Sequence, residues 1–208
     1  LERLELGKSL EGCLGCCFRD EAGHAVRNPP RPLRQLDELR AMDYSLLPVE
    51  SYFERKGKRQ LDYISSQGCH FRCGFCADPF VYGRKWTGSD STRVGAEVDE
   101  LWQRHRFDDL SFQDETYFTR AKRVAEIAEE FLRRGDRFTW AATMRADQGE
   151  RLGEEVFALC RRSGLRRVII GVESGDQATV DRIQKDISLE QVLASADKCK
   201  RHGVAAIF

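Results

Sequence analysis

The amino-acid sequence predicts an α/β protein in which about five strand–helix units form a parallel sheet or barrel, preceded by an irregular N-terminal extension. Three observations predict this class. From residue 61 onward, short apolar stretches alternate with stripes at helical spacing, in units of roughly 30 to 45 residues. Residues 168–170 form an unbroken apolar run, typical of a strand buried on both faces of a parallel sheet. All five prolines fall within the first 79 residues, where they disfavour regular structure.

The N-terminal extension covers residues 1–60 and is predicted to be a linker with little regular structure, ahead of a barrel domain at residues 61–208. Residues 28–32 read Asn-Pro-Pro-Arg-Pro. Because proline fixes its own φ angle and disfavours the helical region for the residue before it, this segment is expected to be extended. One short helical piece is expected at residues 33–42.

The first strand of the barrel domain is predicted at residues 61–66, followed by a cysteine-rich loop at residues 69–76. Val94 and Val98 then begin an apolar stripe at helical spacing, which predicts the first long helix. A short second strand follows at residues 109–113.

The next unit is predicted from a second apolar stripe. Ile127 and Phe131 lie on one face of a helix that ends at Gly135, a residue type common just past helix C-termini. A third strand is predicted at residues 138–144, and the helix after it closes at Gly164.

The last units follow the same alternation. Residues 167–172 form the fourth predicted strand. Ser188 and Gln191 have the spacing of a capping box, which marks the start of a helix. That helix is predicted to end near Gly203, and residues 204–208 begin a fifth strand.

The charge balance bears on the class of partner. The chain has 34 Lys and Arg against 34 Asp and Glu, a net charge of zero, whereas proteins that bind nucleic acid usually carry a basic surplus. A nucleic-acid partner is therefore not expected. No apolar run approaches the roughly 18 residues of a membrane span, and a cytoplasmic location is expected.

Cysteine is the most informative residue type in the chain. The eight cysteines form two clusters and two single sites: Cys13, Cys16 and Cys17; Cys69, Cys73 and Cys76; Cys160; and Cys199. Because nothing marks the chain as secreted, we expect reduced thiols and not a disulfide framework. The clustered cysteines are therefore candidate metal ligands.

The second cluster holds three thiols within eight residues, close enough to bind one small inorganic group. Gly68 and Gly74 allow the tight backbone path that such a loop needs. Three cysteines would satisfy three irons of a [4Fe–4S] cluster and leave the fourth iron open for chemistry.

Two other interpretations stay open from the residues alone. Cys73 and Cys76 could form half of a zinc site with Cys13 and Cys16, although the separation is far longer than the roughly 12 to 20 residues usual between zinc half-sites. The thiols could also be buried structural residues without a ligand. The close spacing of three cysteines favours the iron–sulfur interpretation.

The pattern Cys-x3-Cys-x2-Cys with an aromatic residue at Phe75 resembles the cluster loop of the radical S-adenosylmethionine (SAM) enzymes. The resemblance implies a partial (β/α) TIM-like barrel, with Cys69, Cys73 and Cys76 as ligands of a [4Fe–4S] cluster. It implies that the open iron binds SAM, that Phe75 lies beside the adenine, and that SAM is cleaved reductively to a 5′-deoxyadenosyl radical. An electron donor such as a flavodoxin or ferredoxin is also implied.

A second segment extends the resemblance. Residues 171–175 read Gly-Val-Glu-Ser-Gly and resemble the Gly-Ile-Glu-Ser-Gly segment that follows the fourth strand in this family. The resemblance implies that Glu173 and Ser174 contact SAM. Lys185, further downstream, also matches this branch of the family. Glu173 could otherwise be a helix N-terminal carboxylate.

Two further positions complete the predicted site. Residues 112–118 resemble an Asp-Asp-x-Phe segment after the second strand, with Glu115 where a second Asp is common, and Arg145 matches a recurrent arginine. The resemblance implies that Asp114, Glu115 and Arg145 contact SAM. Otherwise the two acids could cap the next helix, and Arg145 could form a surface ion pair.

The residues give an independent reason to group these positions. Cys69, Asp114, Arg145 and Glu173 each follow a different predicted strand, and in a parallel barrel the C-terminal strand ends share one face. Carboxylates and a guanidinium group suit a zwitterionic ligand. We therefore expect one site at this face.

The prolines and the residues after them, at 28–32, 36–39 and 42–48, resemble the linker of cobalamin-dependent radical SAM enzymes, which include methyltransferases and the anaerobic cyclase of bacteriochlorophyll synthesis. The resemblance implies cobalamin bound by a region absent from this sequence. It also implies that the chain is a fragment, cut as its fifth strand begins. The N-terminal cysteines depart from the family pattern and are expected to be strand and turn residues.

The sequence therefore predicts a radical SAM enzyme of the cobalamin-dependent methyltransferase or cyclase type, acting on a small molecule. A radical SAM methylthiotransferase is the alternative within the enzymes, because it shares the Glu-Ser-Gly segment. A non-catalytic zinc or iron–sulfur module is the alternative from another class.

Overall fold

The computed structural model describes residues 2–135 and 137–208 and divides into two units, with the boundary between Arg34 and Gln35. The first unit contains helix α1 (Glu2–Glu5) and a hairpin of β1 (Cys17–Arg19) and β2 (Ala25–Arg27). Cys17 begins β1, and Cys13 and Cys16 are joined by a turn hydrogen bond. These cysteines thus lie in a strand and a turn, as expected.

The second unit begins with short elements that differ from those expected from the sequence. The expected helical piece is a 3₁₀ turn, η1 (Leu36–Glu38), and a second turn, η2 (Tyr44–Leu46), precedes helix α2 (Val49–Lys56). We did not predict α2. Its buried residues are a single pair, Val49 and Phe53, which is too few for a periodic signal.

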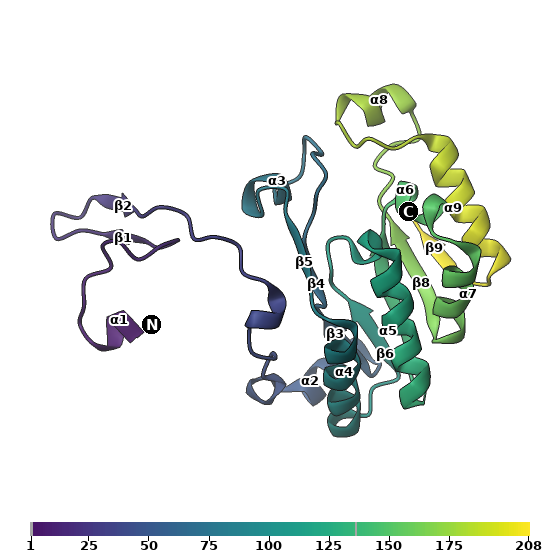
Figure 1. The fold of residues 1–208 in the computed structure, drawn as a ribbon, viewed down its shortest axis with the longest axis horizontal. Coiled ribbons are helices and arrows are strands. Elements are labelled where there is room, and N and C mark those ends of the chain that lie inside the picture. The colour runs from purple at the N-terminus through teal and green to yellow at the C-terminus, as the bar shows by residue number, and fades with distance from the viewer. Residues whose placement is uncertain (1, 136) are drawn as a thin grey trace. The chain divides into compact units, whose positions relative to one another are not determined.

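The centre of the second unit is a parallel sheet, which confirms the predicted class. Its five strands are β3 (Gln60–Tyr63), β6 (Asp109–Phe112), β7 (Thr139–Met144), β8 (Leu165–Ile170) and β9 (Ala205–Ile207), and they neighbour one another in that order (Figure 1). Every pair is parallel. Because spatial order follows chain order, the sheet is the wall of a barrel and not a doubly wound sheet.

Four long helices supply the apolar layer against this sheet: α4 (Ser91–His105), α5 (Ala121–Arg134), α7 (Glu154–Arg162) and α9 (Leu189–Arg201). Their buried side chains join one hydrophobic core with the strands, centred on fully buried residues such as Trp140. The predicted helix signals are confirmed: α5 ends at Gly135, and Ser188 and Gln191 form a capping box at the start of α9. In the described part of the chain no helix is long and apolar enough to cross a membrane.

Shorter elements lie at the strand ends. Helix α6 (Ala146–Arg151) follows β7, α8 (Gln177–Arg182) follows β8, and the 3₁₀ turn η3 (Tyr117–Thr119) follows β6. All three begin within seven residues of a strand end, so they border the predicted site.

A second hairpin carries the cysteine-rich loop. Strand β4 (Ser66–Gly68) pairs antiparallel with β5 (Trp86–Gly88), and helix α3 (Asp78–Val81) belongs to the loop that connects these two strands (Figure 1). We call residues 66–88 the cysteine hairpin. The predicted strand at 61–66 therefore ends earlier, at Tyr63. The hairpin went unpredicted because Ser-Gln-Gly in β4 has no apolar alternation.

Candidate functional site

The predicted site residues lie on segments that follow the C-terminal ends of four neighbouring strands. The cysteine hairpin follows β3, Asp114 and Glu115 follow β6, Arg145 follows β7 and Glu173 follows β8. Since these strands are parallel and adjacent, the four segments leave the sheet at one edge.

The cysteine loop has half-buried, free thiols at Cys69, Cys73 and Cys76. Burial raises the pKa of the Cys69 and Cys76 thiols, and at Cys69 the charge of Arg145 opposes this shift. At Gly68, φ is +86° and a Cβ would lie 2.2 Å from the Lys85 carbonyl oxygen. Only glycine can therefore start this loop.

The donor set of the loop fits an iron–sulfur cluster. In the described ranges, no three His, Cys, Asp or Glu side chains are grouped to hold a single metal ion. A [4Fe–4S] cluster binds each cysteine at a different iron, so its ligands need not meet at one point. Three free thiols on one loop, with a guanidinium group nearby, are suitable ligands for it.

The carboxylate of Asp114 is the main tie between the cysteine hairpin and the sheet. Asp114 is 1% exposed and accepts hydrogen bonds from the Ser65 amide (2.8 Å), the Ser65 hydroxyl (2.7 Å) and the Ser66 hydroxyl (2.5 Å). Burial raises the pKa of this carboxyl group, and the three hydrogen bonds oppose the shift.

The residues beside Asp114 hold the same hairpin. Glu115 accepts hydrogen bonds from the Gly68 amide (3.1 Å) and the Tyr82 hydroxyl (2.9 Å), and the Thr116 hydroxyl donates to the Gly68 carbonyl oxygen (3.3 Å). Neither acid caps the following turn, whose N-cap is Thr116 without a side-chain cap bond. We call Asp114, Glu115 and Thr116 the hairpin clamp.

Arg123, from α5, strengthens this attachment. Its buried guanidinium group donates to the carbonyl oxygens of Ser65 (2.7 Å) and Ser89 (2.8 Å), which lie just outside the two hairpin strands. Both ends of the hairpin are thus tied to the helical layer. Arg123 was not predicted from the sequence, since arginine on a helix is usually solvated.

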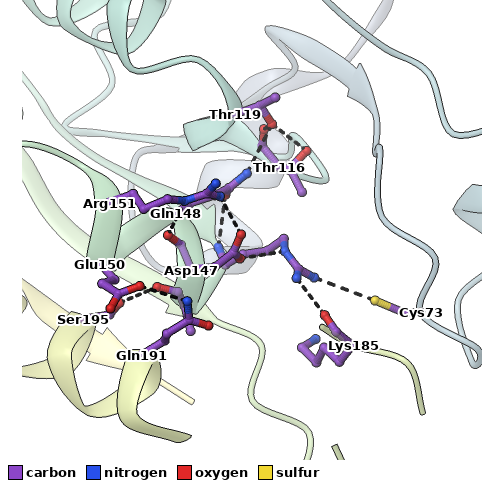
Figure 2. Close-up of polar contacts among 12 residues, drawn as sticks. Cys73, Thr116, Thr119, Asp147, Gln148, Glu150, Arg151, Lys185, Gln191 and Ser195 are labelled. Atoms are coloured by element: carbon purple, nitrogen blue, oxygen red, sulfur yellow. Dashed lines mark hydrogen bonds and ion pairs between the residues drawn. The ribbon is translucent and has the colours of Figure 1, made fainter. Parts of the chain in front are cut away.

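Arg145 is buried among protein groups and is not a surface ion-pair residue. It is 6% exposed, and its guanidinium group donates to Asp147 Oδ1 (3.0 Å), the Lys185 carbonyl oxygen (2.7 Å) and the Cys73 sulfur (3.8 Å) (Figure 2). Its central carbon lies 3.4 Å from the centroid of the Phe71 ring. Arg145 therefore touches one of the predicted cluster ligands directly.

Glu173 and Lys185 form an ion pair at the end of β8. Lys185 Nζ is 2.7 Å from Glu173 Oε1, and Lys185 is 6% exposed. Glu173 has a φ of +69° and lies ahead of the N-cap of α8, Asp176, so it is not a helix N-terminal carboxylate. A Cβ at Gly171 would lie 3.0 Å from Glu173 Oε1 and 3.1 Å from Lys185 Nζ, so glycine leaves room for the pair.

The other two predicted residues differ in their surroundings. The Phe75 ring is 56% exposed, and Lys185 Nζ lies 5.4 Å from its centroid. The Ser174 hydroxyl accepts a hydrogen bond from the Asp176 amide within its own loop. Lys185 was not predicted to be a site residue, although its match to the family segment could have indicated that it lies at the site.

The segment around Lys185 also holds the cysteine loop. The Gly74 amide donates to the Ile183 carbonyl oxygen at 2.8 Å, and Arg72 forms an ion pair with Asp186 at 3.0 Å. Asp186 has a φ of 54°, in the left-handed region that Asp enters more readily than most residues other than glycine. The cysteine loop is thus held both by the hairpin clamp, which follows β6, and by the segment that follows β8.

Comparison with known proteins identifies the family of this site. The model of the radical SAM superfamily matches residues 63–208. An uncharacterized methyltransferase of Pyrococcus horikoshii is 29% identical over 208 residues, covering 100% of this chain and 44% of that protein. The anaerobic magnesium-protoporphyrin IX monomethyl ester cyclase of Rubrivivax gelatinosus is 26% identical over 192 residues, covering 91% of this chain and 34% of that protein. The chain thus spans less than half of these relatives.

Solved structures show the same fold. The cobalamin-dependent S-adenosylmethionine radical enzyme OxsB, with aqua-cobalamin bound, has a TM-score of 0.79 and 22% identity, over 99% of this chain and 30% of that one. The radical S-adenosylmethionine methyltransferase TsrM from Kitasatospora setae has a TM-score of 0.80 and 18% identity, over 99% of this chain and 42% of that one. These likenesses confirm the partial barrel.

The hairpin clamp yields a stability prediction. Asp114→Ala should lower the free energy of unfolding by roughly 3 kcal/mol, because it removes three hydrogen bonds and leaves buried donors at Ser65 and Ser66 without an acceptor. Asp114→Asn keeps one acceptor oxygen and should cost less. Urea denaturation followed by circular dichroism measures both.

Asp108→Ala, at an exposed position beside the same strand, is the matched control and should change the free energy of unfolding by less than about 0.5 kcal/mol. Equal unfolding midpoints for Asp114→Ala and the unmodified chain would contradict the clamp.

Proposed function

Because the chain belongs to the radical SAM superfamily, and is thus an enzyme of this class, we propose that it binds a [4Fe–4S] cluster through Cys69, Cys73 and Cys76 and binds SAM beside it. The observation that carries the proposal is the loop of three free, half-buried thiols, held at the C-terminal edge of the barrel sheet. When bound, the cluster would supply one electron for reductive cleavage of SAM to a 5′-deoxyadenosyl radical.

We propose that the ion pair of Glu173 and Lys185 recognises the methionyl part of SAM. The methionyl part carries an ammonium and a carboxylate group, so a carboxylate and an ammonium from the protein match it in charge. Lys185 has three N–H donors, of which one is directed to Glu173. The exposed ring of Phe75 offers an apolar surface for the adenine, and Ser174 lies next to Glu173 in the same loop.

For the hairpin clamp we propose an indirect role in SAM binding. The carboxylate oxygens of Asp114 and Glu115 are engaged by the cysteine hairpin. Their part is therefore to hold the cysteine loop against the sheet, so that Cys69 and Phe75 keep their places relative to Glu173. Preorganisation of this kind spares the cost of ordering the loop when the ligand binds.

The reaction of the whole protein is proposed from the relatives. The curated relatives include proteins named as a methyltransferase, a cyclase and a hopanoid C-3 methylase, and the similar structures include a cobalamin-dependent enzyme. We propose a cobalamin-dependent methyl transfer or cyclisation on a small molecule, with residues 1–60 as the linker to a cobalamin-binding region. A flavodoxin or ferredoxin would supply the electron.

The cluster is tested by anaerobic reconstitution with iron and sulfide. The chain should bind about four irons, and its reduced cluster should give an EPR signal that changes when SAM is added. Cys73→Ala should lose most of the iron, while Cys16→Ala should keep it. One zinc per chain, or equal losses in the two variants, would contradict this assignment and support a zinc site instead.

The SAM site is tested at Gly171, where a side chain would meet the ion pair. Gly171→Ala should weaken SAM binding to the reconstituted chain several-fold, because Glu173 Oε1 and Lys185 Nζ would each have to shift by a few tenths of an ångström to make room for the new Cβ. Equilibrium dialysis with labelled SAM measures this. Gly153→Ala, whose Cβ would have no neighbour closer than 3.9 Å, should bind SAM normally; equal affinities in the two variants would exclude the proposed role of the pair.

Cobalamin is tested on the natural full-length polypeptide. After incubation with hydroxocobalamin and gel filtration, the protein fraction should retain the cobalamin absorbance in a ratio of one per chain. If no cobalamin co-elutes, the cobalamin-dependent assignment is wrong, and a methylthiotransferase becomes the better candidate.

A further inference from the structure

The charge of Arg145 is only partly neutralised by its carboxylate partner. Asp147 accepts a hydrogen bond from Arg145 at Oδ1 (3.0 Å) and forms a second ion pair with Arg151 at Oδ2 (2.6 Å) (Figure 2). Two guanidinium groups thus share one carboxylate. A net positive charge remains on this group of three residues, and Arg145 is the member that reaches Cys73.

The arginine side of the contact between Arg145 and Cys73 is shielded from water, and the Cys73 thiol is half-buried. Arg145 is buried, and the Phe71 ring lies against its guanidinium group with 3.4 Å between the central carbon and the ring centroid. In such surroundings a charge acts on its neighbour more strongly than it would in solvent. The Arg145 Nη1 to Cys73 Sγ distance is 3.8 Å, within the range of an N–H···S hydrogen bond.

The position of Arg145 is set by protein groups other than the sulfur. Its amide donates to the side chain of Gln148 (3.2 Å), which is buried at the start of α6, and its guanidinium group also donates to the Lys185 carbonyl oxygen (2.7 Å). These contacts hold the donor in place whether or not the thiol carries a ligand. Arg145 is therefore a preorganised donor to one cysteine of the loop.

We propose that Arg145 is a positioning residue that raises the reduction potential of the cluster through its hydrogen bond to the Cys73 sulfur. This inference rests on the proposed cluster site. Reduction adds negative charge that is shared with the cysteine sulfurs, and hydrogen bonds to these sulfurs are among the groups that set cluster potentials. A cationic donor favours the more negative, reduced state.

The experiment is a redox titration of the reconstituted chain, with the reduced cluster followed by EPR. Arg145→Met should shift the midpoint potential to a more negative value. Arg145→Lys keeps the charge but not the planar donor group, and should shift the potential in the same direction by less. Arg151→Met leaves Asp147 to Arg145 alone, so it should shift the potential in the same direction, but by much less, because Arg151 is exposed and does not contact the sulfur.

Iron content and circular dichroism, measured on every variant, separate the possible results. If Arg145→Met does not fold, the smaller negative shift in Arg145→Lys still supports the inference. Potentials equal to that of the unmodified chain in both Arg145 variants, with full iron content, would overturn it and leave the proposed function intact. An unmodified chain that binds no cluster would overturn both.

Discussion

The site depends on one buried carboxylate. Asp114 follows the second strand of the barrel sheet, and its three hydrogen bonds end on Ser65 and Ser66, where the chain leaves the first strand and enters the cysteine hairpin. The hairpin strands are three residues each, too short to be stable without support. The hydrogen bonds of Asp114 and of the rest of the hairpin clamp thus attach the cysteine hairpin to the sheet.

A second support comes from the other side of the loop. Arg145, which follows β7, donates a hydrogen bond to the Cys73 sulfur. The Ile183 carbonyl oxygen, in the segment after β8, accepts a hydrogen bond from the Gly74 amide. These contacts bring buried cations close to the cysteines, where negative charge is expected once a cluster is bound. The same segments carry Glu173, so the cysteine loop, the buried cations and this carboxylate belong to one connected group.

Where the prediction succeeded, the signal was local. Ile127 and Phe131 marked helix α5 through their spacing, and Gly135 marked its end, because these features depend on residues a few positions apart. Helix α2 and the cysteine hairpin had no comparable pattern. Helix α2 is held because Val49 and Phe53 join the common core, and the hairpin is held by residues distant in sequence, as when Glu115 accepts a hydrogen bond from the Gly68 amide at 3.1 Å.

The sequence by itself determined the α/β class, the succession of the five main strands along the chain and the family resemblance, because hydrophobic period and motif spacing are local properties. Only the tertiary structure decided which side chains meet. The Asp114–Ser65 bond joins residues 49 apart in sequence, and the Arg145–Cys73 contact joins residues 72 apart. Resemblance implied that Asp114 and Arg145 contact SAM, which stays a prediction; the structure adds that Asp114 bonds to Ser65 and Ser66 and that Arg145 bonds to the Cys73 thiol. Such contacts depend on side-chain conformation and burial, which leave no periodic trace in the chain.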